Sequence, residues 1–249
     1  MLNLIISGCN GYMGRLTAEL AAIDTDVSVS AGISRSVVTD LPFKTYTNYS
    51  GFEGTADVLI DFSSPAAVDI GMLDMCVANN IPAVLCTTGY SDAQTSKIKT
   101  AAEKLPIFKT ANFSIGINLL TEIVTQTAAK LGLDFDIEIS EAHHRRKVDA
   151  PSGTALMLAE AARKGLAPHR TGYVFDRSSR REPRSDSEIG IISARGGTIP
   201  GEHTVMFAGR DEVIEFKHTV YSRDVFAAGA IRAAKFLADV REPGIYDKF

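Results

Sequence analysis

One segment of the sequence concentrates side chains that can exchange protons and bind anions. Residues 141–155 read EAHHRRKVDAPSGTA, with two imidazoles and three cations in five consecutive positions. An unperturbed imidazole has a pKa near ~6.5, so His143 and His144 can each exchange a proton near neutrality. The three cations at 145–147 lower that pKa by like-charge repulsion and can hold carboxylates. These residue types suit a small dicarboxylate whose reaction includes proton transfer.

The same segment runs into the predicted start of a helix. Pro151 precedes Ser152, Gly153 and Thr154, and apolar residues then repeat at helical spacing to Lys164. The first backbone N–H groups of a helix have no partner within it, and the helix dipole is positive at that end. We therefore expect a substrate carboxylate to bind at this helix start.

Two other interpretations of the segment remain open. The adjacent histidines could be metal ligands, although no H-x-x-x-H or carboxylate pattern accompanies them, and we predict no metal site. A basic run is also commonly a solvated surface. The Pro-Ser-Gly-Thr helix start favours a substrate site over both.

Composition limits the classes of protein that this chain can be. Its 249 residues are 45% hydrophobic and 22% charged, which is typical of one or two globular domains. The net charge of −4 argues against a general nucleic-acid binder. Three scattered cysteines indicate reduced thiols, and we see neither a signal peptide nor a membrane span, so we expect a cytoplasmic protein.

The N-terminal residues predict a dinucleotide-binding turn. A short apolar run over residues 2–7 ends in GCNGYMG, and a helical pattern follows. In this context Gly8 permits a tight turn, Gly11 permits close approach of a pyrophosphate, and Gly14 permits close packing of helix and strand. The alternative is a glycine-rich turn without a ligand.

The end of the second predicted strand, residues 27–33, bears on which nucleotide is bound. NAD-specific sites usually place an acid about 20 residues past the glycines, on the ribose 2′-hydroxyl. This chain has Ser34 and Arg35 there. Because a guanidinium and a hydroxyl can bind a 2′-phosphate, we expect NADPH to be accepted and preferred, with NADH also used. Alternatively, Arg35 is a solvated loop residue that stacks on adenine in either cofactor.

Strands and helices alternate through the first 113 residues, which predicts a parallel sheet with helices on both faces. The expected elements are strands at 2–7, 27–33, 58–62, 83–86 and 107–109, and helices at 66–79 and 92–104. Ligands bind such sheets beyond the carboxyl ends of the strands. The residues at those ends are Phe62-Ser63, Thr87-Thr88-Gly89 and Ala111-Asn112-Phe113.

The rhythm changes after Phe113 and predicts a second, α+β domain. The expected elements are helices at 114–131 and 154–164, strands at 136–141, 189–195, 203–208 and 213–220, and a polar loop at 165–188. One face of this mixed sheet would pack on the helices and the other would be open. A last helix at 226–240 resembles those of the first domain. We therefore expect a Rossmann-type dinucleotide-binding domain at 1–113 and 222–249, and a substrate-binding and oligomerisation domain at 114–221.

Several strings of residues together resemble the dihydrodipicolinate reductase family. They are Gly8-x-x-Gly11-x-Met13-Gly14, Ala111-Asn112-Phe113-Ser114-x-Gly116-x-Asn118, Gly201-Glu202-His203-Thr204, Phe207, the Arg223–Phe226 region and, most specifically, the segment at 141–155. The resemblance covers essentially the whole chain in order. Two departures are Ser34, where some members carry an acid, and Cys86, where a glycine is often found.

The resemblance implies an NAD(P)H-dependent reduction of 4-hydroxy-tetrahydrodipicolinate, a cyclic imine dicarboxylate, in which hydride reaches ring C4, water is lost and tetrahydrodipicolinate results. It implies that His143 is the proton donor and acceptor, Lys147 the general acid, and His144 with Gly153 and Thr154 the carboxylate site, to which we add Ser152. It also implies a homotetramer whose open sheets pair. Together with the strand ends, the expected cofactor contacts are Gly8, Cys9, Asn10, Gly11, Tyr12, Met13, Ser34, Arg35, Phe62, Thr87, Thr88, Ala111, Asn112 and Phe113.

Two competing functions keep the same first domain. An amino-acid dehydrogenase such as an aspartate dehydrogenase would share the fold but not the His143-His144-x-x-Lys147 string. A non-catalytic NADP(H) sensor would need the glycine turn but no proton-transfer residues. The intact segment at 141–155 counts against both.

Overall fold

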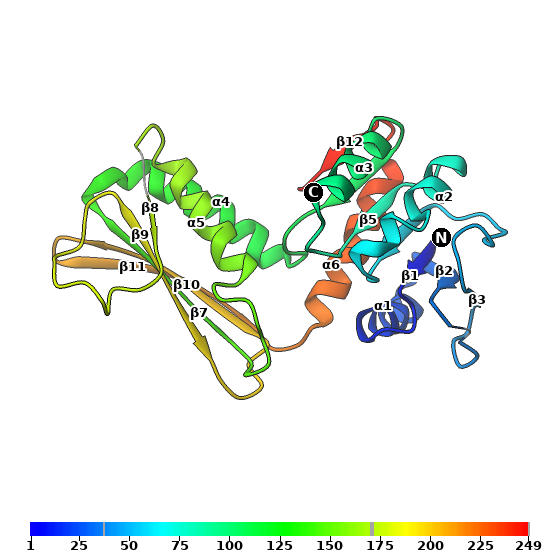
Figure 1. Cartoon of the computed structure of the whole chain (residues 1–249), viewed down its shortest axis with the longest axis horizontal. Helices are drawn as coiled ribbons and strands as arrows, with labels where there is room; N and C mark the ends of the chain where they lie inside the picture. Colours follow the sequence, from blue (N-terminus) through cyan, green and yellow to red (C-terminus); the bar gives the residue numbers. More distant parts are fainter. Residues whose placement is uncertain (37, 170–171, 249) are drawn as a thin grey trace. The chain divides into compact units, whose positions relative to one another are not determined.

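The computed structural model describes residues 1–36, 38–169 and 172–248, and the chain divides into two compact units (Figure 1). Unit 1 comprises Met1–Phe113 and Asp224–Phe249, and unit 2 comprises Ser114–Arg223. The chain re-enters unit 1 at Asp224 rather than at residue 222, where we had placed the boundary.

Unit 1 is built on a seven-stranded parallel sheet in the order β12-β6-β5-β4-β1-β2-β3. Its strands are β1 (Leu2–Ser7), β2 (Val27–Ile33), β3 (Lys44–Tyr46), β4 (Val58–Asp61), β5 (Ala83–Leu85), β6 (Pro106–Lys109) and β12 (Gly244–Tyr246). Because β1 pairs with both β2 and β4, the strand order reverses direction beside it. That reversal is where doubly wound sheets bind ligands, and the Rossmann-type fold class is confirmed.

Helices cover both faces of this sheet (Figure 1). On one face lie α2 (Met72–Ala78) and α3 (Asp92–Ala102), and on the other α1 (Tyr12–Ile23) and α6 (Asp224–Asp239). In β1, Leu4 and Ile5 are both fully buried but belong to the cores on opposite faces. A strand buried on both sides needs a continuous apolar run, which explains the sequence LNLIIS.

Four local expectations for unit 1 and unit 2 were wrong. The single helix expected at 66–79 is a 3₁₀ turn, η1 (Pro65–Val68), followed by α2, because Gly71 between them has a left-handed backbone with φ of 95°. Three short strands were missed, namely β3, β12 and, in unit 2, β8 (Gly172–Val174) inside the expected polar loop.

Unit 2 is a mixed five-stranded sheet in the order β11-β10-β7-β9-β8. Besides β8 it contains β7 (Asp136–His143), β9 (Glu188–Arg195), β10 (Gly201–Gly209) and β11 (Glu212–Val220). The helices α4 (Ile115–Leu131) and α5 (Gly153–Gly165) pack against one face, and η2 (Gly132–Asp134) follows α4. The central strand β7 pairs parallel with β9 and antiparallel with β10, as expected for a mixed sheet.

Side chains alternate strictly between the two faces of β7. Ile137 and Ile139 are buried in the core under the helices, whereas Ser140 is exposed on the other face. Ile192 of β9 pairs with Ser140 and is 59% exposed. One face of the sheet is therefore left without helices, as the alternating pattern predicts.

The Arg-rich loop between β8 and β9 is held onto the sheet by ion pairs. Arg177 pairs with Glu138 and Glu188 at 2.7 and 2.8 Å, and Arg184 reaches both Asp136 at 2.6 Å and Glu138 at 3.1 Å. Of the described helices, none is long and apolar enough to cross a membrane.

Candidate active site

The side-chain alternation of β7 places the catalytic candidates. Glu141 and His143 continue the inward-facing series of Ile137 and Ile139, so the sheet face that is apolar under the helices becomes polar at the end of this strand. Glu141 is 3% and His143 8% exposed. The strand runs two residues further than the 136–141 that we predicted, and His143 therefore belongs to the sheet rather than to a loop.

Glu141 is the centre of a buried hydrogen-bond network. Its Oε2 lies 2.5 Å from His143 Nδ1 and accepts from Arg195 Nη1 at 2.8 Å. Its Oε1 accepts from Arg195 Nη2 at 2.7 Å and from the Ser152 backbone N–H at 3.1 Å. Although burial alone raises the pKa of a carboxyl, the bonds from Arg195 and His143 lower the pKa of Glu141 to about 2. Glu141 is therefore ionised at neutral pH.

Both imidazoles of this cluster are neutral at neutral pH. Burial lowers the pKa of His143, and the neighbouring Glu141 carboxylate offsets part of that effect. His203 of β10 packs against it, with the ring centroids 5.1 Å apart. Burial and then the proximity of His143 lower the pKa of His203 to about 4. Its Nε2 lies 3.0 Å from Ser152 Oγ.

The turn after β7 and the start of α5 complete the site. Lys147 lies in that turn, with its Nζ 2.8 Å from Asp149 Oδ1 and its side chain 21% exposed. Ser152 caps α5 by accepting from the Ala155 N–H, and Gly153 is the first residue of the helix. The residues that we singled out in this segment lie at the end of β7, in the following turn and at the start of α5, and they are His143, His144, Lys147, Ser152, Gly153 and Thr154.

Two of the cations that drew attention in the sequence lie on the surface. Arg145 and Arg146 are exposed, whereas His144 is half-buried. The guanidinium that enters the network comes instead from Arg195, at the end of β9. Sequence reasoning missed Arg195 and His203 as site residues. The alternation of side chains along β9 and β10 could have indicated them, because it places Arg195 and His203 on the same sheet face as Glu141.

The backbone of the glycine turn in unit 1 is packed so closely that two of its positions require glycine. Gly8 has φ of 77°, and a Cβ there would lie 2.7 Å from the Phe62 carbonyl oxygen. A Cβ on Gly14 would overlap the Gly8 carbonyl oxygen. The turn closes with the Gly11 N–H donating to the Gly8 carbonyl at 2.9 Å. Only glycine fits at 8 and 14, which leaves the backbone of the turn open to a ligand.

A cavity of about 480 Å³ lies at this turn within unit 1. Its lining includes six of the expected cofactor contacts, which are Gly8, Asn10, Gly11, Ser34, Arg35 and Phe62. It also includes Ser63, which the sequence placed at a strand end with Phe62. The lining residues that sequence reasoning did not single out are Ile33, Ser36, Thr47, Tyr49, Ser64, Ala66, Ala67 and Ile70. A concave site with a glycine turn and a guanidinium at its edge fits the adenosine and phosphate portion of a dinucleotide.

The remaining expected contacts lie outside this cavity. Cys9 and Phe113 are buried, at 0% and 5% exposure. Phe113 packs on Phe108 in the core. Tyr12, Thr88 and Ala111 are exposed, Met13 and Thr87 are half-buried, and Asn112 is 8% exposed.

A buried carboxylate that the sequence did not reveal joins three strand ends. Asp61, at the end of β4, is fully buried. It accepts from Ser7 Oγ at 2.7 Å, Ser63 Oγ at 2.5 Å and Thr87 Oγ1 at 2.8 Å. Asp61 therefore orders the carboxyl ends of β1, β4 and β5, where we expect the cofactor.

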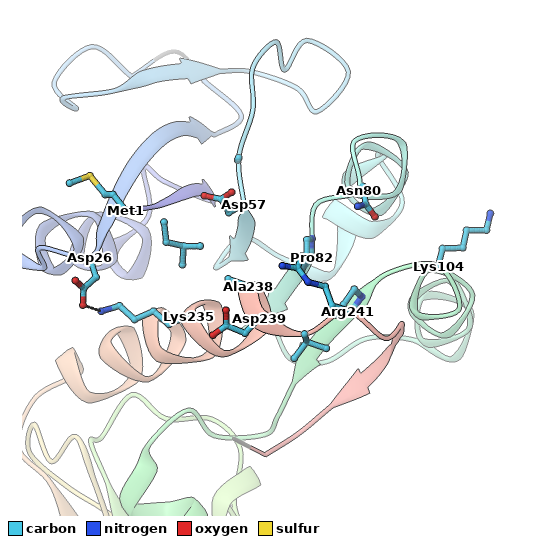
Figure 2. A pocket seen from close by; sticks show the side chains of 14 residues that line it. Met1, Asp26, Asp57, Asn80, Pro82, Lys104, Lys235, Ala238, Asp239 and Arg241 are labelled. Carbon is cyan, nitrogen blue, oxygen red and sulfur yellow. Dashed lines mark hydrogen bonds and ion pairs between the residues drawn. The ribbon is translucent and has the colours of Figure 1, made fainter.

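A larger cavity, about 600 Å³, lies at the opposite edge of the same sheet (Figure 2). Its lining comes from the amino ends of strands, such as Asp57 and Pro82, and from α6, whose Lys235 pairs with Asp26 at 3.2 Å. None of the expected site residues is in that lining. Among the described residues, no group of three or more His, Cys, Asp or Glu side chains is arranged to hold a metal.

Comparisons with known proteins match the chain over its whole length. Two family models match in succession, "Dihydrodipicolinate reductase, N-terminus" over residues 2–113 and "Dihydrodipicolinate reductase, C-terminus" over residues 116–248. The 4-hydroxy-tetrahydrodipicolinate reductase of Clostridium tetani is 41% identical over 247 residues, covering 99% of this chain and 95% of that protein. The enzyme of the same name from Caldanaerobacter subterraneus is 45% identical over 246 residues, covering 99% and 96%.

The fold also matches a solved structure. A dipicolinate-bound dihydrodipicolinate reductase from Paenisporosarcina sp. TG-14 superposes with a TM-score of 0.80 at 24% identity, covering 99% of this chain and 98% of that one. At this identity the match supports the fold alone.

Proposed function

The chain belongs to the dihydrodipicolinate reductase family and is an oxidoreductase of lysine and diaminopimelate biosynthesis, and on this premise we propose how its residues divide the work. The reaction is the NAD(P)H-dependent reduction of 4-hydroxy-tetrahydrodipicolinate to tetrahydrodipicolinate. The observation that carries the assignment of residues is the segment at 141–155, in which Glu141, His143 and Ser152 form a buried polar cluster at the end of β7 and the start of α5.

His143 and Lys147 handle protons in this proposal. When bound, the reduced nicotinamide supplies a hydride to ring C4 of the substrate. The C4 hydroxyl can leave as water only if it receives a proton. Lys147, partly exposed and paired with the carboxylate of Asp149, acts as the general acid. His143 donates a proton to the substrate ring or accepts one from it.

The substrate is a small dicarboxylate, and we assign its binding to the start of α5. The N–H groups of Gly153 and Thr154 stand at the positive end of the helix dipole. His144 lies at the beginning of the turn that precedes this helix, and the Ser152 side chain caps the helix start. A Cβ on Gly153 would meet nothing within 4 Å, so space is open beside this backbone for a carboxylate.

The chain binds NAD(P), and we propose that the glycine turn, Ser34, Arg35 and Phe62 hold it and that NADPH is preferred. Support comes from the cavity that these residues share and from the exposed Arg35 guanidinium at its edge, which can pair with a 2′-phosphate. Thr87, Thr88 and residues 111–113 follow at neighbouring strand ends. Comparing the Michaelis constants of NADPH and NADH tests the preference. An NADH constant at least about tenfold below that of NADPH would refute it.

We further propose a homotetramer in the cytoplasm. The uncovered face of the unit 2 sheet, with Ile192 59% and Val213 56% exposed, supports pairing of sheets between subunits. The free cysteines Cys9, Cys76 and Cys86 suit a reducing compartment. Light scattering of the purified protein measures the oligomer directly, and a monomeric mass would refute the tetramer.

The decisive experiment follows NADPH absorbance while the substrate is generated by a dihydrodipicolinate synthase. We expect oxidation of NADPH only when synthase, its substrates and this protein are all present. Omitting the synthase is the control for substrate-independent oxidation. Active synthase without NADPH or NADH oxidation would contradict the assigned reaction.

A further inference from the structure

The proposed role of His143 leaves open which ring nitrogen exchanges the proton and what holds the ring. We infer that Glu141, clamped by Arg195, is the positioning residue of His143: it fixes the proton of the neutral imidazole on Nδ1 and leaves Nε2 as the nitrogen that exchanges protons with the substrate. This inference rests on the proposed function of His143 and deepens it.

Hydrogen bonds to both carboxylate oxygens fix the orientation of the Glu141 side chain. Each of its two oxygens accepts two hydrogen bonds, from Arg195 and His143 at Oε2 and from Arg195 and Ser152 at Oε1. Arg195 is itself fixed, because its Nη2 donates to the Asp149 carbonyl at 2.6 Å and its Nη1 to the Ala194 carbonyl at 2.6 Å. A buried carboxylate with four donors cannot rotate without losing several charge-assisted bonds.

The tautomer of His143 follows from the chemistry of its partner. An ionised carboxylate accepts hydrogen bonds and donates none. Glu141 has a pKa of about 2, so the contact of 2.5 Å to His143 Nδ1 requires a proton on that nitrogen. In the neutral ring the other nitrogen, Nε2, then carries the lone pair. Such second contacts commonly set which imidazole nitrogen reacts.

The charges around His143 keep the resting ring neutral and still allow a transient cation. Glu141 faces it from the same strand, Arg195 from β9, Lys147 from the following turn and His203 from β10. Burial lowers the pKa of His143 first, Glu141 raises it, and the two cations lower it again. A proton gained at Nε2 would therefore place its charge directly against the Glu141 carboxylate.

Space is reserved on the Nε2 side of the ring. A Cβ built on Gly201, at the start of β10, would lie 3.2 Å from His143 Nε2. Glycine at this position thus leaves room beside the nitrogen that the inference assigns to proton exchange. Any larger residue would crowd it.

Spectroscopy of the unmodified protein tests the tautomer without using the reaction. The chain has five histidines, so a spectrum of the protein labelled with ¹⁵N-histidine has few signals to resolve. The signal that disappears in His143→Gln identifies this residue. We expect the nitrogen shifts of an Nδ1–H tautomer at about pH 7.5, above the ordinary histidine pKa. The shifts of an Nε2–H tautomer would overturn the inference even if the protein proved fully active.

Kinetics test the positioning role. In Glu141→Gln we expect kcat to fall by about 10²-fold, the lower range for positioned proton transfer, with the substrate KM changed by less than about threefold. The pKa of His143 in the ¹⁵N titration should also fall, since the carboxylate no longer opposes burial. A Glu141→Gln protein with kcat within about twofold of wild type would overturn the proposal.

Glu160→Gln is the matched control. Glu160 on α5 accepts two bonds from Arg163 at 2.7 Å and one from Tyr173, so the same substitution breaks a similar arginine pair away from the site. It should leave kcat and the His143 signal unchanged. Arg195→Lys, which keeps the charge but not the two-pronged contact, covers the case in which Glu141→Gln does not fold. We expect an intermediate kcat and the Nδ1–H tautomer retained, and a kcat equal to wild type would count against the clamp.

Discussion

At the scale of single residues, the basic run in the sequence is misleading about which cation acts on the catalytic candidate. Arg145 and Arg146 neighbour His143 in sequence but are exposed. Arg195 lies far along the chain, yet it pairs with Glu141 and so sets the environment of the imidazole. The β7–β9 register, in which His143 pairs with Arg195, makes this possible.

Substitutions at Lys147 and His144 should separate proton transfer from substrate binding. We expect Lys147→Ala to lower kcat by about 10²-fold or more, because the general acid is lost. His144→Ala should mainly raise the substrate KM, by about tenfold, with a smaller effect on kcat. Steady-state kinetics on both substrates measure the two constants. Arg210→Ala, an exposed cation in the β10–β11 turn, is the control.

The roles would be contradicted by the opposite pattern. If Lys147→Ala raised only KM, Lys147 would be a carboxylate ligand rather than an acid. If His144→Ala lowered kcat as strongly as His143→Ala, the division of labour between the two imidazoles would be wrong.

The residues that sequence reasoning missed depend on contacts between strands. The string at 141–155 identified the family and the local group of catalytic candidates, because those side chains follow one another along the chain. Arg195 and His203 enter the site through strand register, and Asp61 through three strands that converge. When a single Asp lies in an apolar strand, the sequence does not indicate which hydroxyl groups will contact it in the folded chain. Its position beside the glycine turn becomes visible only when the sheet is assembled.

At the scale of elements, length and periodicity decided what could be predicted. The strand at 2–7, the strand at 27–33 and the strand at 189–195 were confirmed to within a residue, because their apolar runs match the burial that their sheets impose. The three-residue strands β3, β8 and β12 have no period to detect. They form because a neighbouring strand edge offers hydrogen bonds, and that edge is not part of their own sequence.

The Arg-rich loop is the element whose role the sequence left open, and its ion pairs give it a structural one. Arg184 is 19% exposed and donates to Asp136, Glu138 and the Ile137 and Glu188 carbonyls. A Cβ on Gly190, opposite Glu138 on β9, would overlap the Glu138 carboxylate. The glycine therefore gives this carboxylate the space in which it meets the loop.

We expect Arg184→Ala to destabilise unit 2 by about 1–3 kcal/mol, since it removes several bonds to charged and backbone acceptors that are partly buried. Urea unfolding followed by circular dichroism measures the change. Arg181→Ala, an exposed neighbour in the same loop, should change stability by no more than about 0.5 kcal/mol. Equal stability of the two variants would show that the loop contacts contribute nothing to the fold.

At the scale of the whole molecule, the buried titratable side chains of the two units should respond to acid in opposite directions. In unit 1, burial raises the pKa of Asp61, so its ionised form disfavours the folded state and this cost disappears as pH falls. In unit 2, burial lowers the pKa of His143, His203 and His218. A histidine whose pKa is lower in the folded state contributes stability above its unfolded pKa, near ~6.5, and this is lost as pH falls.

His203 makes this acid response measurable, because it is 3% exposed and its pKa is lowered to about 4. Between about pH 7 and about pH 5 the unfolded chain protonates this histidine while the folded chain does not, which costs about 2 kcal/mol. The corresponding fall in the Tm of unit 2 is roughly 8 °C. Glu141, with a pKa of about 2, loses its own contribution only below its unfolded pKa near ~4.3, so the two windows are separate.

In His203→Gln the Tm measured at about pH 7 can differ from wild type in either direction, because Ser152 gains an amide partner in place of an imidazole. The informative quantity is the slope of Tm against pH. We expect the slope between about pH 7 and about pH 5 to be clearly shallower in His203→Gln than in wild type. His169→Gln, an exposed histidine after α5, should keep the wild-type slope. A His203→Gln slope as steep as wild type would mean that His203 takes up its proton equally in the folded and unfolded chains. The conclusion that His203 is neutral where it packs against His143 would then be wrong.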